Sequence, residues 1–328
     1  MSLKRPSNVS VLRRTQPCLL VVFLSCLLTN LIHAHPGDGL DLDSSGNIYF
    51  TDVYRKTVWR LDTEGRLTPI LEDRWAHGLS VDSLDRIWVE VEESNTSYSI
   101  VRLESDGEET TVVGPRPRGL DLYGVNILGD SDGNLYFPHS DPPRFHALGI
   151  RLRTAEGDVS LLAGGDEPGH QDGCGASALF SGLQAMRFGG DGWIYVVDRD
   201  SVRRVSRAGE VETLYRGIRL ESPRNQPFDN GNDLVSNRVY GLAAKQGSGE
   251  VFVAYHGNRS VVRLSEAGRK VVYRSKIPWA PVGVVLKGSS IVIKETGLEP
   301  GSIRFGPRIV VVEPDGEARE LVEVESDL

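Results

Sequence analysis

The sequence has very few cysteines and none of the common catalytic signatures. Only three of its 328 residues are cysteines, and Cys18 and Cys26 fall in an N-terminal segment that we predict to be removed. The single remaining thiol, Cys174, then has no intrachain disulfide partner. A P-loop and a Cys-x-x-Cys pair are missing, and the one Gly-x-Ser-x-Gly match, residues 129–133, falls in a stretch that predicts a hairpin turn rather than a strand-to-helix elbow. These features disfavour common serine hydrolases, nucleotide enzymes and redox shuttles.

The chain also lacks an excess of positive charge. Its net charge is −8, and the four basic residues among positions 1–34 face no acid there. Without that segment, 33 basic residues stand against 45 acidic ones, a net charge of −12. Such a surface repels phosphate backbones, so we expect no nucleic-acid partner.

Long apolar runs are missing except at the N-terminus. Residues 1–34 combine a basic start, the apolar run "CLLVVFLSCLLTNLI" and a small residue at Ala34, which is typical of a secretory signal. We predict cleavage after Ala34 and a secreted or periplasmic protein, with a lipid anchor at Cys26 as the less favoured alternative. No other run is long enough for a membrane span, so the predicted mature chain is 35–328.

Alanine- and leucine-rich stretches are missing too, and 36 glycines take their place, a mix that favours short strands over helices. "GLDLDSSGNIYFTD" from Gly39 returns as five looser copies, for example "AMRFGGDGWIYVVD" from Ala185. A second pattern follows each copy, as in "VWRLDTEGRLTPIL". The expected turn glycines of this second pattern are Gly65, Gly107, Gly157, Gly209, Gly268 and Gly316. Six copies of two linked hairpins, 39 to 59 residues apart, predict an all-β, six-bladed β-propeller of four-stranded antiparallel blades.

The stretch Asp41–Asp52 also matches the oxygen spacing of an EF-hand calcium loop. The repeat argues for a hairpin instead, because the acids Asp41 and Asp43 give way to Arg187 and Gly189 in another copy while the turn persists. A feature that survives without its carboxylates does not require a metal.

Residues 172–217, "DGCGASALFSGLQAMRFGGDGWIYVVDRDSVRRVSRAGEVETLYRG", resemble an NHL repeat. This resemblance implies a six-bladed propeller of the superfamily that also holds SMP-30/gluconolactonase-like and peptidyl-α-hydroxyglycine lyase-like proteins. It specifies a fold and leaves the activity open.

The long insertions all fall on connections that should lie on one face of the ring, and they are 138–148, 164–182, 217–238 and 296–307. Long loops tend to persist where they bind something. We therefore predict that this face binds a ligand or a protein.

Two rings of side chains should open near the axis of that face. The first, just before each innermost strand, comprises Asp38, His77, Tyr123, Gln184, Tyr240 and Val282. The second, at the end of each second strand, comprises Asp52, Val91, His139, Asp198, Tyr255 and Glu295, with His256 beside them. Turn capping by the aspartates and packing by the histidines are the plainer alternatives.

Two functional hypotheses follow. In the first, the face binds a small molecule or protein through Tyr123, Gln184, Asp198, Tyr240, Tyr255 and His256. In the second, the chain is a metal-dependent hydrolase, lactonase or lyase, in which Asp38, His77, His139 and Glu295 hold one divalent cation, calcium or zinc.

The family patterns are incomplete. By resemblance, Asp38 stands for the first acid of an SMP-30-type calcium site, but Gln184 and Tyr240 occupy positions where that site has an asparagine and an aspartate. His77 has the position of one of the three zinc-binding histidines of the lyase type, with Asp198-Arg199 a further similarity.

Overall fold

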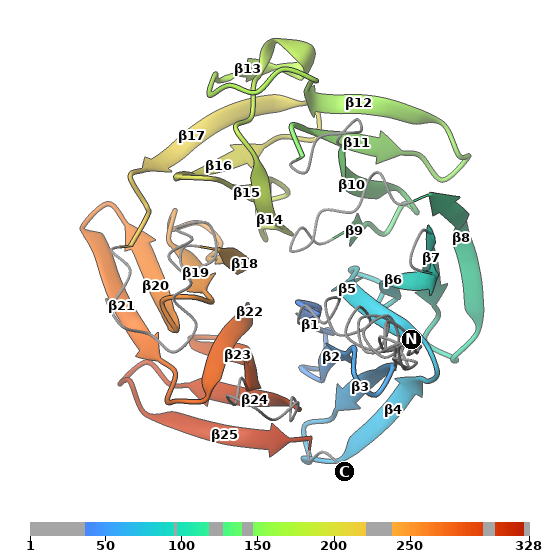
Figure 1. The fold of residues 1–328 in the computed structure, drawn as a ribbon, viewed down its shortest axis with the longest axis vertical. Coiled ribbons are helices and arrows are strands. Elements are labelled where there is room, and N and C mark those ends of the chain that lie inside the picture. The colour runs from blue at the N-terminus through green and yellow to red at the C-terminus, as the bar shows by residue number, and fades with distance from the viewer. Residues whose placement is uncertain are drawn as a thin grey trace, which may run out of the picture. The chain divides into compact units, whose positions relative to one another are not determined.

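A computed structural model describes residues 37–94, 97–117, 127–139, 147–220, 238–297 and 306–324. These residues form six antiparallel sheets arranged radially around a central channel (Figure 1). Among them no helix is both long and apolar enough to cross a membrane. The predicted signal residues 1–34 lie outside the described residues, so the predicted cleavage stays a prediction.

Each blade is built from four strands that are consecutive in sequence, with the first strand innermost. Blade 1 has β1 Leu40–Leu42, β2 Ile48–Asp52, β3 Thr57–Leu61 and β4 Leu67–Leu71; blade 2 has β5 Trp75–Val81, β6 Ile87–Ser94, β7 Ser97–Leu103 and β8 Glu109–Pro117; blade 3 has β9 Leu128–Gly129, β10 Leu135–His139, β11 Gly149–Arg153 and β12 Val159–Gly164. Blade 4 has β14 Leu183–Phe188, β15 Ile194–Asp198, β16 Ser201–Val205 and β17 Glu210–Arg216; blade 5 has β18 Val239–Ala244, β19 Val251–Tyr255, β20 Ser260–Ser265 and β21 Gly268–Arg274; blade 6 has β22 Trp279–Lys287, β23 Ser290–Gly297, β24 Pro307–Val312 and β25 Ala318–Glu323. The six-bladed prediction is confirmed.

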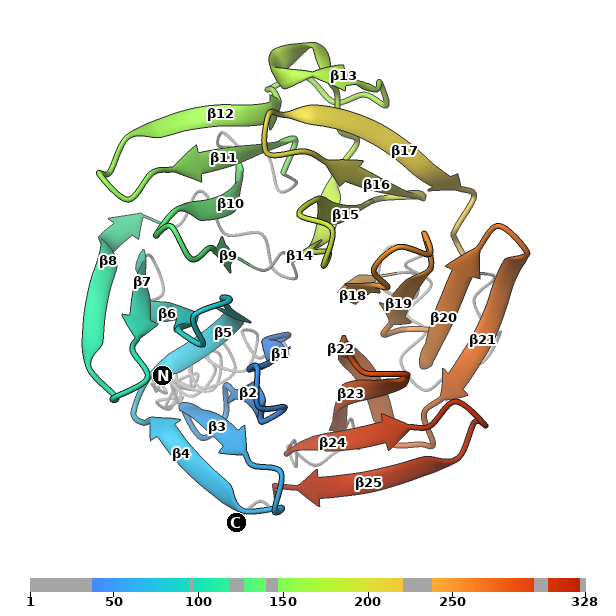
Figure 2. The same ribbon diagram turned by 180° about the vertical axis from the view of Figure 1, so that it is seen from behind.

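The predicted hairpin turns are confirmed as well. All six glycines expected between the third and fourth strands have positive φ, between +84° and +106°, a conformation that glycine adopts without steric cost. Asp41–Asp52 is the β1–β2 hairpin of blade 1, with Gly46 at φ +82°. These turns lie on one face of the ring, which we call the plain face and which is toward the viewer in Figure 2. The opposite face is called the mouth face.

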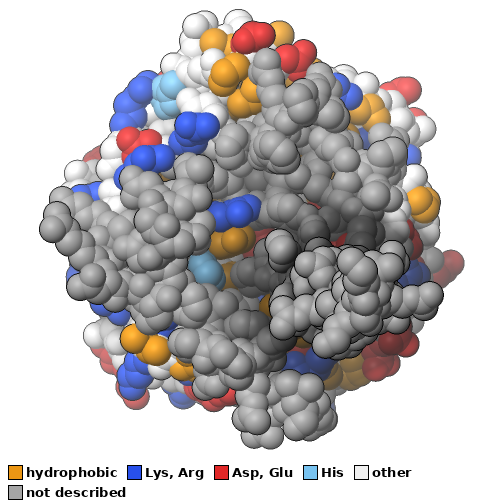
Figure 3. All heavy atoms as spheres, viewed as in Figure 1, with side chains coloured by type: hydrophobic (Ala, Val, Ile, Leu, Met, Phe, Trp, Pro, Cys, Tyr) orange, Lys and Arg blue, Asp and Glu red, His pale blue; other side chains and the backbone are white. Residues whose placement is uncertain are grey.

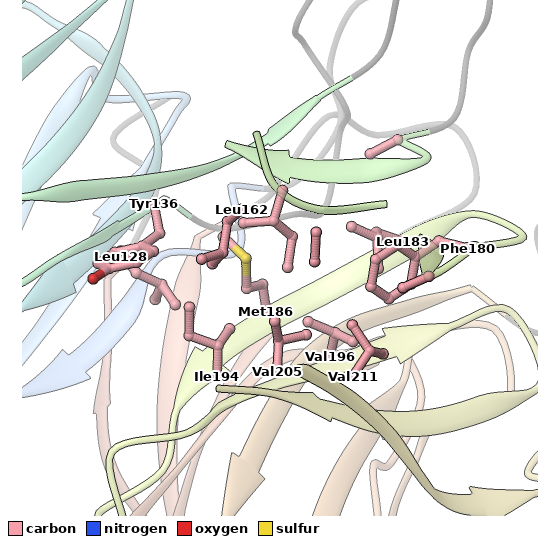
Figure 4. Packing of buried hydrophobic residues seen from close by; sticks show 14 residues of the cluster. Leu128, Tyr136, Leu162, Phe180, Leu183, Met186, Ile194, Val196, Val205 and Val211 are labelled. Carbon is pink, nitrogen blue, oxygen red and sulfur yellow. The ribbon is translucent and has the colours of Figure 1, made fainter. Parts of the chain in front are cut away.

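Apolar residues fill the space between neighbouring blades. The described residues form six buried clusters, one at each interface between consecutive blades. In the cluster between blades 3 and 4, Leu128, Tyr136 and Leu162 meet Met186 and Ile194 (Figure 4). Because a single sheet cannot cover both of its faces, this stacking around the ring is what completes each core.

Blades 1 and 6 are each built from four strands that are consecutive in sequence, so neither blade takes a strand from the other end of the described chain. An apolar cluster including Leu40, Phe50 and Val292 joins the two blades. Lys294 of β23 adds a polar bridge, since its Nζ donates to Gly37 O at 2.7 Å, to Thr51 Oγ1 at 2.9 Å and to Gly39 O at 3.3 Å. Side-chain contacts therefore hold the seam between the first and last blades.

One insertion differs from the expectation that all of them lie on the mouth face. Within 164–182, β13 (Gly173–Cys174) pairs with β17 and makes blade 4 five-stranded at its outer rim (Figure 1). The 3-10 turn Gly175–Ser177 follows it. Most of the other three insertions falls outside the described residues.

Candidate functional site

In blades 2, 4, 5 and 6 the innermost strand carries a β-bulge at the position of the first predicted ring, whereas Asp38 of blade 1 precedes β1 and lies at no register shift. Register shifts fall at His77–Gly78 in β5, Gln184 in β14, Tyr240 in β18 and Val282 in β22. A bulged residue has no partner on the adjacent strand, and the bulge redirects its side chain. Most described members of the first predicted ring therefore lie at a β-bulge that is repeated from blade to blade. Tyr123, its member from blade 3, lies outside the described residues.

Polar groups from blades 1 and 5 meet at the mouth of the channel. The charge of Arg238, next to β18, acts on Asp38 of blade 1 and on Tyr240 of blade 5. Blade 6 lies between blades 5 and 1 in the ring. The interaction between Arg238 and Asp38 therefore runs across the channel. The Arg238 guanidinium lies 5.0 Å from the centre of the Tyr240 ring, which meets His256 edge-on at 5.3 Å between centroids. The mouth face is hollowed at its centre, with a basic and a histidine side chain at the rim over β18 and β19 (Figure 3).

Several buried side-chain atoms have no hydrogen-bond partner among the described residues, for example Glu295 Oε1 and Thr296 Oγ1 of blade 6. Three of them belong to members of the predicted rings or to their neighbour His256: Asp38 Oδ2, Gln184 Oε1 and His256 Nε2, from blades 1, 4 and 5. We call Asp38, Gln184, Arg238, Tyr240 and His256 the mouth site.

The titration behaviour of the mouth site follows from its burial. Burial raises the pKa of Asp38 to about 7, against the opposing charges of Lys294 and Arg238. Burial also lowers the pKa of His256 to about 4, helped by the charges of Arg238 and Arg259, so the imidazole is neutral at pH 7. Burial likewise lowers the pKa of Lys294, although the ammonium has three acceptors for its three protons. The mouth site thus contains two groups that can accept or donate a proton, Asp38 and His256, beside the charge of Arg238.

The channel has a floor below this mouth. Arg187 of β14 donates to Leu40 O at 2.9 Å and forms an ion pair with Asp41, both in blade 1. Blades 1 and 4 are opposite in the six-membered ring, so this contact spans the channel. Asp38 precedes β1, and Asp41 is three positions further along the chain, which corresponds to about 10 Å of extended chain. Arg187 therefore bridges the channel below the mouth.

The four candidate metal ligands are in separate environments. His77 Nε2 lies 2.9 Å from Glu92 Oε2, and His139 Nε2 lies 3.1 Å from the Arg151 guanidinium. Glu295 accepts from Arg308 Nε at 2.6 Å, while Asp38 faces the cations of Lys294 and Arg238.

Across the described stretches, no group of three or more His, Cys, Asp or Glu side chains is placed to hold a metal ion. A cation beside a candidate ligand disfavours a second positive charge. These four residues therefore do not fit a shared calcium or zinc site.

Two ligand-binding candidates of the second ring already have protein partners. Asp198 accepts from the amides of Ser181 and Gly182, both at 2.8 Å, and pairs with buried Arg203 at 3.0 Å. Tyr255 is 1% exposed and donates its hydroxyl to Ile218 O at 2.6 Å. Both side chains fasten connections between blades. The plainer alternative, turn capping, also describes Asp52, which accepts from the backbone and side chain of Arg55.

Sequence reasoning missed three basic residues that shape the pocket: Arg187, Arg238 and Lys294. Each of the three interacts with a residue of blade 1, which is distant in the sequence. A local sequence pattern cannot predict such an interaction. The one available signal was Lys294, a lysine at an inward position of the apolar strand "SSIVIKETG", since a buried lysine needs acceptors.

Comparison with solved structures shows the fold. A streptogramin B lyase structure superposes with a TM-score of 0.52 at 18% identity, covering 90% of this chain and 86% of that chain. A regucalcin from Agrobacterium tumefaciens, described as a calcium-binding protein, gives 0.52 at 16% identity, with 82% and 84% covered. A chain of a nidogen/laminin complex gives 0.55 at 14% identity, with 85% and 93% covered.

No protein-family model matches the sequence, and comparison with curated proteins finds no match. The resemblance to NHL repeats therefore stays a prediction. The structural likenesses and the six sheets together identify the chain as a six-bladed β-propeller.

Proposed function

We propose that this protein binds a small polar molecule in the mouth site. The observation that supports this most strongly is the set of three buried polar atoms without partners, on Asp38, Gln184 and His256. Buried polar groups in proteins are nearly always paired, with protein atoms, ordered water or a ligand. Three such atoms from three blades around one channel favour a shared partner in that channel.

The shape of the site favours a small molecule over a protein loop that threads the ring. Arg187 bridges the channel below Asp38, which disfavours a loop that passes through the whole ring. Tyr240 and His256, whose rings meet edge-on, supply flat aromatic surfaces. A few polar groups on a largely apolar wall are typical of small-molecule pockets.

A ligand screen with matched variants tests this function. Thermal shifts are recorded for a panel of acidic, neutral and basic polar small molecules on the protein, on Gln184→Leu and on Gln246→Leu. Gln246 lies exposed in a plain-face turn, so its substitution should change no shift. We expect at least one compound whose stabilisation is lost in Gln184→Leu alone. A panel whose hits stabilise all three proteins equally would place binding elsewhere and contradict the proposal.

The second candidate is an enzyme, a lyase or hydrolase that acts at the same mouth. A carboxyl group with a pKa of about 7 is suited to general acid–base work near neutral pH, and structural neighbours include a lyase and a gluconolactonase. Asp38→Asn should then abolish turnover of a bound compound while its thermal shift remains. Elemental analysis of the purified protein tests the metal-dependent version, which one stoichiometric calcium or zinc would support.

Export is proposed on sequence grounds. The basic start and apolar run of residues 1–34 favour a secreted or periplasmic protein. N-terminal sequencing of the mature chain from culture fluid or periplasm should begin at His35. Recovery of intact Met1 in the cytoplasm would contradict export.

A further inference from the structure

Two arginine charges act on the buried imidazole of His256, in a protein whose net charge is −8. Arg259 also faces the acid Glu295, and Lys294, whose pKa burial lowers, faces Asp38 and Asp52. Asp38 is the acid on which Arg238 acts, and burial holds its carboxyl close to neutrality. Cations gathered in a concave, water-poor site of an acidic protein attract and hold anions.

The hydrogen-bonding groups have the same preference. His256 is neutral at pH 7 and therefore carries one N–H and one lone pair. Its Nε2, buried without a partner, can present that N–H to an acceptor from the ligand. The Arg238 guanidinium has five N–H donors in a fork. It can thus add an acceptor from a ligand to the contacts it already makes.

We propose that the molecule bound in the mouth site carries an oxyanion, a carboxylate or a phosphate-type group, held by the Arg238 guanidinium and the Nε2–H of His256. This inference rests on the proposed function and specifies the chemical class of its ligand. Carboxylate and phosphate-type groups share the feature that matters here, a delocalised negative charge on oxygens that accept hydrogen bonds.

Asp38 makes the binding of such a group depend on pH. Lys294 on β23, together with Arg238 and Tyr240 at the start of β18, interact electrostatically with this carboxyl group, and Asp52 on β2 acts on Lys294 in turn. Ionised Asp38 adds a negative charge beside the anion, so affinity should fall as pH rises through about 7. Asp38→Asn should remove this dependence and strengthen binding at about pH 8.

The test uses sulfate and acetate as probes, because both stay fully ionised between about pH 6 and about pH 8. Isothermal titration at constant ionic strength compares the protein with Arg238→Met, Arg238→Lys and Arg66→Met. Arg66 is 72% exposed on the plain face, so its substitution serves as the control. Acetamide and glycerol are titrated in parallel as uncharged probes. Tighter binding of sulfate, a tetrahedral anion, would indicate phosphate-type ligands, and tighter binding of acetate would indicate carboxylates.

We expect Arg238→Met to weaken the preferred anion at least about tenfold, Arg238→Lys to recover part of that loss, and Arg66→Met to change nothing. Unfolding temperatures of each variant separate lost binding from lost folding. Uncharged probes that bind through Gln184 while neither anion does would overturn the oxyanion inference and leave the proposed function standing. Absence of any Gln184-dependent binding, by anions or by uncharged probes, would overturn both.

Discussion

Removal of the Lys294 ammonium should weaken the seam that closes the ring. The side chain is 1% exposed and reaches from blade 6 to three acceptors in blade 1. Methionine has a similar length and fills the same space without a donor. We therefore predict that Lys294→Met folds to the same ring with a lower free energy of unfolding.

The size of the effect follows from the fate of each acceptor. Gly39 O keeps its bond from the Thr51 amide, at 3.1 Å, and the Thr51 hydroxyl keeps His77 O, at 3.2 Å. Gly37 O loses its strongest donor, and a hydrogen bond to a charged group contributes about 1.5–3 kcal/mol. Relief from burying an ammonium offsets part of the total. We expect a net loss of about 1–2 kcal/mol.

Urea unfolding followed by tryptophan fluorescence measures this loss, with Lys287→Met as the matched control. Lys287 also joins blade 6 to blade 1, by donating to Gly46 O at 2.9 Å, but it is exposed. Its substitution should cost no more than about 0.5 kcal/mol. A Lys294→Met protein as stable as the wild type, or one no less stable than Lys287→Met, would refute the reasoning.

Three further predictions concern the pocket and the blade interfaces. Arg187→Met removes the contact across the channel and should lower the free energy of unfolding by about 1–3 kcal/mol in urea melts; an unchanged value would contradict the floor. Gly129→Ala places a Cβ 2.1 Å from the Trp88 ring, whereas Gly114→Ala meets no atom within 4 Å, so thermal melts should show a loss of at least about 1 kcal/mol for the first alone. For Asp38, burial raises the folded pKa to about 7 from its ordinary value of 3.8, so stability should fall by about 1 kcal/mol per pH unit as pH rises from about 4 to 7. Asp38→Asn should flatten that slope, and equal slopes in both proteins would contradict the assignment.

Features set by local sequence were predictable. The hairpins repeat because alternating apolar residues end at turns that need positive φ, and glycine meets that need at positions such as Gly65 and Gly209. The ring position of Gln184 and Tyr240 was also predictable from the repeat alone. The bulges that redirect those side chains were not, since they appear only when a strand is paired with its neighbour.

The polar pairing was harder to predict because it depends on residues distant in sequence. Glu295 lies near the end of the second strand of blade 6, as the repeat predicts, but its pairing with Arg308 was not predicted. Lys294 and Gly37 are 257 residues apart, so nothing near either one predicts the other. The repeat locates each side chain within its blade, whereas the identity of its partner depends on the ring having closed.

An experimental electron-density map of the channel mouth would show whether the mouth site binds a molecule. We expect an ordered molecule or water cluster within hydrogen-bond distance of Asp38 Oδ2, Gln184 Oε1 and His256 Nε2, above an Arg187 that still spans the channel. A map in which these three atoms pair with protein groups instead, leaving no room between them, would contradict a binding site at this mouth.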